Sequence, residues 1–263
     1  MIILFRCLTR LFSFDFYLKT AYHNSFKQKY MCGRYTLTYE EVAELEEFLH
    51  SAEADGLSEK QAGKSFANYN AAPSHNMPAA YVNEEQKRVL TPMHWGFMGW
   101  QPKPGTKPFL PINTRDDSVA KKPMWKKAFS NNRCIVPASG FYEWAGKKGS
   151  KTPHYIYPTR DKFLGFAGIF SDMAPEDSEA EMSYSIITTS PNKVMENIHD
   201  RMPVILHPSE FDDWLNPENR DPGYLLDFLR PYPDDALAEH IVSKAVGNVR
   251  NNHEGLIQKA GLF

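Results

Sequence analysis

The chain has 263 residues, of which 42% are apolar and 24% are charged, and its 19 prolines and 15 glycines are close to average usage. This composition excludes a collagen-like, coiled-coil or wholly disordered protein, and the length suits one large domain or two small ones. No run of about 18 uncharged apolar residues occurs, so the sequence predicts no membrane-spanning helix and no membrane partner.

Charge is unevenly distributed along the chain. The formal net charge is −2, but residues 1–30 carry five basic residues and one acidic residue, which leaves −6 for residues 31–263. An acidic body is not typical of a nucleic-acid-binding protein, so any such site must be a local basic groove.

The three cysteines set the chemical context. Cys7, Cys32 and Cys134 form no CxxC pair and are too few for a disulfide framework or a cysteine-rich zinc site. We therefore expect no metal and no cofactor. A reducing compartment, the cytoplasm, fits this cysteine usage best.

Residues 1–30 differ from the rest of the chain. They are apolar and aromatic, but Arg6, Arg10 and Asp15 interrupt them and no small-residue cleavage site follows, which argues against a signal peptide. Two alternatives remain, a targeting leader of another kind or translation that begins at Met31. We favour the second and interpret 1–30 as an N-terminal extension outside the mature domain, residues 31–263.

The first elements after Met31 are a strand and a helix. Residues 32–37 have the composition of a short strand. Thr38 with Glu41 three positions later forms a capping-box pattern, which predicts that a helix begins there. The apolar residues 42, 45, 48 and 49 supply its buried face, and the polar, turn-rich residues 51–65 predict a surface loop.

Many short β-type runs follow, and prolines, glycines, asparagines and aspartates separate them. The predicted strands are 79–82, 89–95, 133–144, 153–158, 163–170, 184–189 and 204–206, and the predicted helices are 124–130, 192–198 and 209–215. An acidic loop at 172–181 and a proline-rich stretch at 216–235 lie between elements. Strands dominate without a regular βαβ alternation, which predicts an α+β fold: a single β-rich domain with a barrel-like mixed sheet and short peripheral helices.

Four segments place polar groups in apolar or aromatic surroundings. They are MCGR at 31–34, PINTR at 111–115, ASGFYEW at 138–144 and IHDRMP at 198–203. A cysteine, an asparagine, a glutamate and a histidine would form an acid–base and nucleophile set if the fold brought them together.

Each of these residues also has a purely structural interpretation. Cys32 could be a small buried hydrophobe, and Glu143 could face solvent and pair with a nearby lysine. His199 could form local hydrogen bonds only, and Asp200 with Arg201 could be a surface ion pair worth under about 1 kcal/mol.

Five motifs together favour the functional interpretation. MCGRY, NTR, SGFYEW, HDRMP and the late SKAVGNVRN at 243–251 resemble, in order, those of the SRAP family, the SOS-response-associated peptidases or abasic site processing proteins. The resemblance extends from Met31 to about Ile257. It implies the SRAP fold and a DNA-damage protein that binds abasic sites in single-stranded DNA and forms a covalent thiazolidine through an N-terminal cysteine.

The resemblance also implies a role for each matching residue. Cys32 matches the crosslinking cysteine, and Asn113 the asparagine that positions it and the sugar. Glu143 matches the carboxylate that moves protons at the amine, and His199 the histidine that protonates the sugar oxygen. The residues implied in DNA binding are Arg115 and Arg201 at phosphates, Trp100 and Trp144 at bases, and Asn70 and Pro73 along the cleft.

An N-terminal cysteine suits this chemistry. Its amine can form a Schiff base with the aldehyde of an opened abasic sugar, and its thiol can then close a five-membered ring in an intramolecular step. The α-amine, with a pKa near 7.7–8.0, is partly neutral at physiological pH. Because Cys32 follows 31 residues here, either translation begins at Met31 or the bond before Cys32 is cut by the chain's own peptidase activity.

Two other functions remain open from the sequence. One is a thiol peptidase or amidohydrolase in which Cys32 attacks a carbonyl carbon with help from Glu143 and His199. The other is a non-covalent single-stranded DNA-binding module that uses the arginines and tryptophans. For all three functions we expect a cytoplasmic monomer that associates with the nucleoid when it binds DNA.

Overall fold

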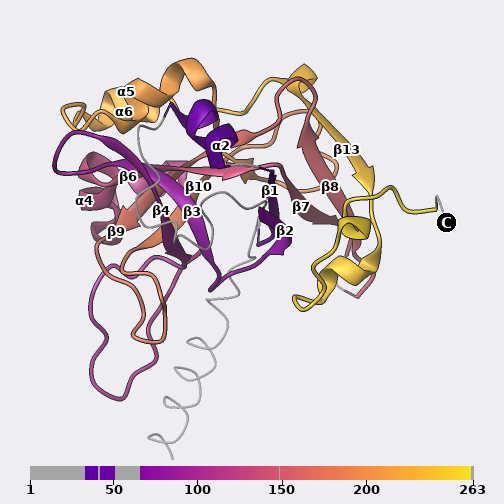
Figure 1. The fold of residues 1–263 in the computed structure, drawn as a ribbon, viewed down its shortest axis with the longest axis horizontal. Coiled ribbons are helices and arrows are strands. Elements are labelled where there is room, and N and C mark those ends of the chain that lie inside the picture. The colour runs from indigo at the N-terminus through magenta and orange to yellow at the C-terminus, as the bar shows by residue number, and fades with distance from the viewer. Residues whose placement is uncertain (1–32, 41, 51–65, 148, 262–263) are drawn as a thin grey trace, which may run out of the picture. The chain divides into compact units, whose positions relative to one another are not determined.

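The structure, a computed structural model, describes residues 33–40, 42–50, 66–147 and 149–261. Residues 1–30, Cys32, Glu41 and the loop predicted at 51–65 lie outside this part of the chain, so the expectations for them stay predictions. The described residues form strands in two sheets, with short helices around them (Figure 1).

The first sheet has five antiparallel strands in the order β13-β8-β7-β1-β2. Their bounds are β1 Tyr35–Tyr39, β2 Phe66–Ala71, β7 Gly140–Ala145, β8 Thr152–Pro158 and β13 Leu237–Ile241. The central strand β7 joins β1 to β8, so the residues that follow Cys32 lie directly beside the SGFYEW motif.

The second sheet follows the order β11-β10-β4-β3-β6-β9-β12, and β5 pairs with β10. Its strands are β3 Asn76–Val82, β4 Arg88–Trp95, β5 Asn113–Arg115, β6 Arg133–Ala138, β9 Leu164–Ser171, β10 Ser183–Thr189, β11 Met202–Pro203 and β12 Ile205–Leu206. Because β10 runs parallel to β4 and β5 and antiparallel to β9 and β11, the sheet is mixed.

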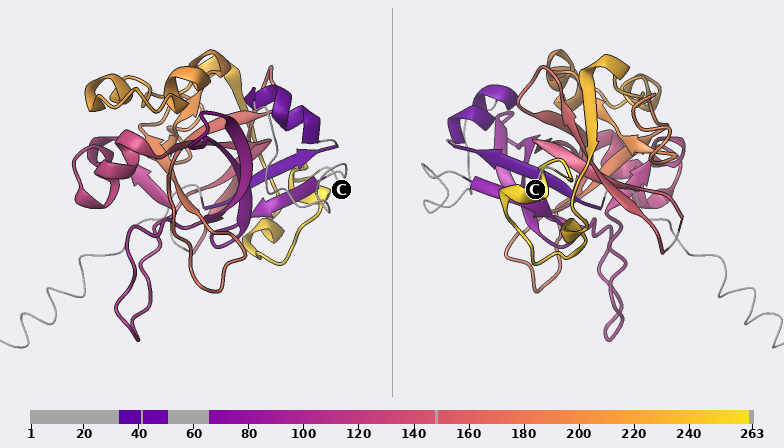
Figure 2. Two further views of the ribbon diagram at one scale, coloured as in Figure 1. Left: turned by 60° about the vertical axis from the view of Figure 1, so that its left-hand side comes forward. Right: turned by 90° about the vertical axis from the view of Figure 1, so that its right-hand side faces the viewer.

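The strands of the second sheet curve into a ring (Figure 2). Strand β10 pairs with both β4 and β9, which brings the two ends of the strand order together. The pairing of β3 with β6 is confined to Ala80 and Ile135, so the ring is not closed into a complete barrel. The predicted β-rich fold with a barrel-like mixed sheet is confirmed.

Aromatic side chains join the two sheets. Tyr35 of β1 packs edge-on against Trp95 of β4, with ring centroids 5.1 Å apart, and Phe141 of β7 packs against Phe166 of β9 at 5.8 Å. All four side chains are buried. Edge-to-face aromatic pairs add about 0.5–1.5 kcal/mol to the free energy gained from burial, so these contacts fix the facing of the sheets.

Short helices lie at the periphery, as predicted. In the part of the chain that the structure describes they are α2 Val42–Leu49, α3 Asp116–Val119, α4 Pro123–Asn131, α5 Phe211–Leu215 and α6 Pro222–Leu226, with four single 3-10 turns. In α2 the buried residues are Val42, Leu45 and Leu49, which confirms its predicted apolar face.

One predicted helix start and two predicted elements are wrong. The helix expected to begin at Thr38 begins at Val42, because Thr38 lies in β1 and pairs with Ala67 of β2. The strand expected at 133–144 is two strands, β6 and β7, in different sheets, because the chain crosses between them at Ser139, whose N–H donates to Thr36 O at 2.7 Å. The helix expected at 192–198 is a turn instead. The Asn192 side chain accepts from the N–H of Met195 as a helix N-cap does, but the i→i−4 bonds that follow, from Glu196 to Asn192 O and from His199 to Met195 O, are not consecutive, so no regular helix forms.

Gly140 makes the crossing from β6 to β7 possible. A Cβ atom there would lie 2.5 Å from the hydroxyl of Tyr155 and 2.7 Å from the backbone oxygen of Ile156. Because the second neighbour is backbone, the clash cannot be relieved by turning one side chain.

We predict that Gly140→Ala lowers the free energy of unfolding by about 1–3 kcal/mol, as overpacked core substitutions do. The matched control is Gly247→Ala, because no atom lies within 4 Å of a Cβ at that position. Urea denaturation of both variants measures the difference. Equal stability of the two variants would show that β8 yields easily at this contact.

Candidate functional site

Asn113 lies on the inner face of the second sheet. The hydroxyls of Tyr184 and Tyr35 are hydrogen-bonded at 2.9 Å in the buried space between the sheets, so Tyr184 points from β10 toward β1. Ile186, two residues later, points the same way, and it is the ladder partner of Asn113 in β5. Asn113 therefore faces β1 and the five-stranded sheet.

Glu143 lies on the inner face of the opposite sheet. Phe141 pairs with Tyr35, and Glu143 follows two residues later on the same face. The glutamate is only 3% exposed, and its Oε1 accepts the Trp144 N–H at 3.1 Å. Its burial excludes the alternative that Glu143 is a solvent-facing partner of a lysine.

The chain just after Cys32 runs between these two residues. The N–H of Tyr142 donates to Arg34 O at 3.0 Å, which continues the β1–β7 pairing by one residue toward Glu143. On the other side, a Cβ atom at Gly33 would lie 3.8 Å from Cδ1 of Ile112, the neighbour of Asn113. Cys32 itself lies outside the described residues, but the residue that follows it is thus beside both motifs.

His199 ends the turn that precedes β11. Its side chain is buried, its Nδ1 lies 2.9 Å from Asp200 Oδ1, and the backbone N–H of Arg201 approaches Nδ1 at 3.2 Å. An Nδ1 that carries a proton donates to Asp200, whereas an Nδ1 without one accepts from Arg201 and leaves the ring proton on Nε2. Nε2 has no hydrogen-bond partner among the residues that the structure describes.

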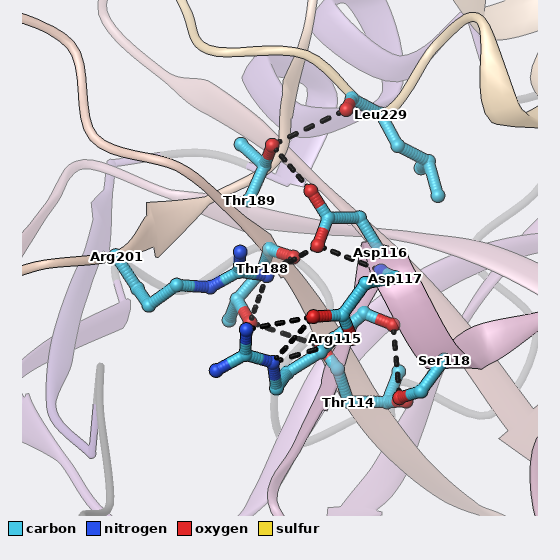
Figure 3. A network of polar contacts seen from close by, with 9 residues as sticks. All are labelled: Thr114, Arg115, Asp116, Asp117, Ser118, Thr188, Thr189, Arg201 and Leu229. Carbon is cyan, nitrogen blue, oxygen red and sulfur yellow. Dashed lines mark hydrogen bonds and ion pairs between the residues drawn. The ribbon is translucent and has the colours of Figure 1, made fainter.

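An ion pair and hydrogen bonds hold the side chain of Arg201 in place (Figure 3). Its Nη2 donates to Asp116 Oδ1 at 2.6 Å and also to the backbone oxygen of Thr188. Asp116 in turn accepts from the Thr189 hydroxyl at 2.8 Å. This network ties the end of β5 and the start of β11 to β10, and it shows that Arg201 does not form a surface pair with Asp200.

Arg115 differs from Arg201 in its surroundings. Its guanidinium donates to both carboxylate oxygens of Asp117, two residues away, and both side chains are more than half exposed (Figure 3). The guanidinium holds the pKa of Asp117 below its usual value. An exposed pair of this kind contributes little to stability, so Arg115 can exchange Asp117 for another anion.

Asn70 binds the C-terminal motif, SKAVGNVRN, through side-chain hydrogen bonds. Its Oδ1 accepts from Arg34, and its Nδ2 donates to the backbone oxygens of residues 246, 248 and 251 at 2.9–3.3 Å. Arg34 also donates to Val246 O at 2.9 Å, and burial lowers its pKa. The SKAVGNVRN motif is therefore bound through its backbone to the segment that follows Cys32.

The remaining predicted residues lie apart from Asn113 and Glu143. Trp144 follows Glu143 in β7 and so faces the other side of the sheet, where it packs on a cluster that includes Tyr142, Tyr155 and Leu256. Pro73 is exposed in the turn after β2. Trp100 is 54% exposed, in the long segment between β4 and β5.

Sequence reasoning missed a polar pair near Glu143, formed by His154 and Glu239. His154 of β8 is the cross-strand partner of Glu143, and its Nδ1 lies 2.6 Å from Glu239 Oε2 of β13. Glu143 and His154 therefore share one face of the sheet. The alternation of β8 could have placed His154 on that face, but the pairing of β8 with β13 has no sequence signal.

Other chemistry finds little support in the described part of the chain. Burial raises the pKa of the Cys134 thiol, which makes it a poor nucleophile. No cluster of three or more metal-ligating side chains occurs among the described residues. None of the helices described is long and apolar enough to cross a bilayer.

Comparison with known proteins identifies the family. Residues 31–249 match the family model described as SOS response associated peptidase (SRAP). The chain belongs to the SRAP family. The matched region begins at the methionine that precedes Cys32.

Curated relatives of this SRAP chain carry one common name. This chain is 34% identical over 229 residues to the abasic site processing protein YoqW of Bacillus subtilis, and the aligned region covers 87% of this chain and 99% of YoqW. It is 31% identical to the abasic site processing protein YedK of Escherichia coli, over 72% of this chain and 83% of YedK. A crystal structure of a Bacteroides thetaiotaomicron protein has the same fold, with a TM-score of 0.72 at 22% identity over 87% of this chain and all of that one.

The difference between the two aspartates generates a stability prediction. Asp116→Asn removes the charge that holds the largely buried Arg201 and should lower the free energy of unfolding by about 1–2 kcal/mol, allowing for partial exposure. Asp117→Asn, at the same helix start but in an exposed pair, is the control and should change it by less than about 0.5 kcal/mol. The urea concentrations at the midpoints of unfolding test this. Equal losses of stability in the two variants would mean that the ion pair of Arg201 with Asp116 stabilises the fold no more than the exposed pair does.

Proposed function

We propose that this SRAP chain captures abasic sites in single-stranded DNA by a covalent bond to Cys32 when that residue is N-terminal. The observation that carries the proposal is the position of Gly33. A Cβ atom there would lie 3.8 Å from Ile112, the neighbour of Asn113, and the next residue, Arg34, accepts the N–H of Tyr142, the neighbour of Glu143. The names of the relatives and the matching motifs support the same lesion as substrate.

The reaction needs no redox partner. The Cys32 amine adds to the C1′ aldehyde of the opened sugar, and loss of one water gives an imine. The thiol sulfur then adds to the imine carbon while its proton passes to the nitrogen, which closes a thiazolidine. Amine and thiol stand on adjacent carbons, so ring closure has the high effective concentration of an intramolecular step.

The side chains take the roles that their surroundings suit. The protonated Nε2 of His199 donates to the ring oxygen of the closed sugar and promotes its opening. The buried carboxylate of Glu143 accepts and returns protons at the amine, and the Asn113 amide orients the sugar. Arg115, whose partner is exposed, binds a flanking phosphate, whereas Arg201 positions β5 and β11.

Residues 1–30 must be absent from the active form under this mechanism, because an amide nitrogen at Cys32 cannot form an imine. We propose that the active chain begins at Met31 and that removal of Met31 exposes Cys32. Cleavage before Cys32 by the chain itself would yield the same terminus.

The first prediction compares three forms of the protein. The Cys32-terminal chain should retain DNA with an abasic site on a denaturing gel, and capture should accelerate as pH rises through neutrality, since the amine titrates near pH 7.7–8.0. The chain that keeps residues 1–30, verified by intact mass, should not capture it. Cys32→Ala should form no stable adduct without reductant while it still binds DNA.

Two results would contradict the mechanism. An uncut long chain that captures abasic DNA as fast as the Cys32-terminal chain would exclude the thiazolidine. A stable adduct of Cys32→Ala would move the nucleophile to another residue.

The second prediction separates sugar opening from ring formation. His199→Ala should slow capture of a closed abasic sugar by about 10²–10⁴-fold and recover on a pre-opened aldehyde. Glu143→Gln and Asn113→Ala should be slow on both substrates. If all three variants lose activity together with melting temperature, these residues are structural and the assigned roles are wrong.

A further inference from the structure

A row of three titratable side chains crosses the inner face of the first sheet: Glu143 of β7, His154 of β8 and Glu239 of β13. His154 pairs directly with Glu143, and Ile156, two residues further along β8, pairs with both Phe141 and Glu239. Because Phe141 and Glu143 point to the inner face, the alternation of strand residues places His154 and Glu239 there as well. In the strand order β13-β8-β7, His154 therefore lies between two carboxylates.

The row runs from a buried residue to a solvent-accessible one. Glu143 is 3% exposed, whereas the side chains of His154 and Glu239 are 13% and 36% exposed. Nδ1 of His154 lies 2.6 Å from Oε2 of Glu239, and this bond fixes the orientation of the imidazole ring. The Cβ atoms of directly paired strand residues are about 4.5–5.5 Å apart, so His154 also lies close to Glu143.

The burial of Glu143 works against its proposed role. Loss of hydration favours the neutral, protonated form of a carboxyl group, and in that form Glu143 cannot accept a proton. The N–H of Trp144, which donates to Oε1 at 3.1 Å, favours the carboxylate. A positive charge within about 4–6 Å favours the carboxylate further, by about 10-fold or more in the acid dissociation constant. The ionised form of Glu143 thus depends on a cation beside it.

His154 is the side chain of this sheet that can supply that cation. None of its five strands, as the structure describes them, contains a lysine or an arginine, and their histidines are His154 and His240. His240 faces the other side of the sheet, where its ring packs against Tyr155 and Tyr157 and its Nε2 lies 2.7 Å from Ile257 O. Positive charge on the inner face therefore comes from His154.

The cations around the sheet do not replace His154. Lys147 and Lys151, between β7 and β8, are exposed, so water screens their ammonium groups. The turn η3 Lys244–Gly247 also contacts β8, but it packs through Val246 in the cluster on the opposite face, and its lysine is exposed. Asn113, on the facing sheet, is neutral.

We propose that His154, held by Glu239, is a positioning residue that keeps Glu143 in its carboxylate form, so that Glu143 can accept a proton from the Cys32 amine. The amine cannot supply the charge itself, because it reacts as the neutral base. The carboxylate of Glu239 is the most exposed of the three groups, so solvent screens its repulsion of Glu143. The inference rests on the proposed function and deepens it, because it names the group that sets the charge of Glu143.

The first experiment compares pH profiles of capture. The parent and His154→Gln, both as the Cys32-terminal chain, react with a single-stranded oligonucleotide that contains one abasic site, and denaturing gels give the rates from pH 5.5 to 8.5. Titration of the α-amine is common to both chains and cancels in the ratio of the two rates.

The ratio should depend on pH in one direction. Imidazole gains its charge between pH 8 and 5, and loss of that charge raises the pKa of Glu143, so the acid limb of the variant's profile moves to higher pH. The rate of His154→Gln relative to the parent should therefore fall about 10-fold between pH 8.5 and pH 6. A ratio that stays constant over this range would overturn the proposal.

The second experiment is a double-mutant cycle. Glu143→Gln has no carboxylate for His154 to act on, so addition of His154→Gln to it should slow capture at pH 6 by less than about twofold. Full additivity of the two substitutions would show that His154 acts on another group, and would overturn the proposal.

Two further variants separate charge from packing. His154→Phe keeps an aromatic ring but no charge, and it should show the same fall in the ratio as His154→Gln. The matched control is His240→Gln, on the next strand and the opposite face, whose ratio to the parent should not change with pH. Recovery of the parent's profile in His154→Phe would show that the ring serves packing only, and would overturn the proposal.

The third experiment does not depend on capture. In protein labelled with ¹³C at the glutamate carboxyl groups, the signal of Glu143 is the one that Glu143→Gln removes. Its titration midpoint should lie at higher pH in His154→Gln than in the parent.

Failure of this inference is distinguishable from failure of the proposed function. If the Cys32-terminal chain captures abasic DNA while neither the rate ratio nor the titration of Glu143 responds to His154, only the role of His154 is wrong. If the titration responds but the chain captures no DNA, the covalent chemistry is wrong and the control of the Glu143 charge by His154 stands.

Discussion

The ion pair between Arg201 and Asp116 is the constraint on which the candidate site depends. Asp116 follows β5 directly and Arg201 precedes β11, and the pair closes over β10 between them. A short parallel strand of three residues has few backbone hydrogen bonds of its own, so this side-chain bond fixes Asn113 against β10. His199 is fixed by the same contact, because it lies two residues before Arg201.

The regular parts of the fold were predictable, and the crossing points were not. Strands β3, β4, β8, β9 and β10 were predicted within a few residues because their apolar runs are bounded by turn residues. The predicted strand 133–144 failed where the sheet changes, since both halves are buried and no periodicity marks the change at Ser139. Strand β5 was missed because the ladder of β10, and not its own three residues, makes it a strand.

The candidate site was predictable in its residue types but not in their partners. Motif order identified Asn113, Glu143 and His199, and the fold brings Asn113 and Glu143 to facing sheets. Motif order did not reveal that Arg201 is held in a largely buried ion pair whereas Arg115 is exposed. Both arginines lie next to aspartates in the sequence, and only long-range pairing distinguishes them. Asn70 likewise matched a motif, but its hydrogen bonds to residues 246–251 give it a structural task that no local pattern shows.

The charges around the candidate site set a condition on the proposed function. Around His199 the two arginines are outnumbered by Asp116, Asp117 and Asp200, so a phosphate that binds Arg115 has to displace the carboxylate of Asp117. Under the proposed function, selection for the lesion falls to the reaction itself, since an abasic sugar offers an aldehyde to the cysteine and an intact nucleotide does not. A net charge of −6 over residues 31–263 suits the proposed function, because it limits attachment to undamaged DNA.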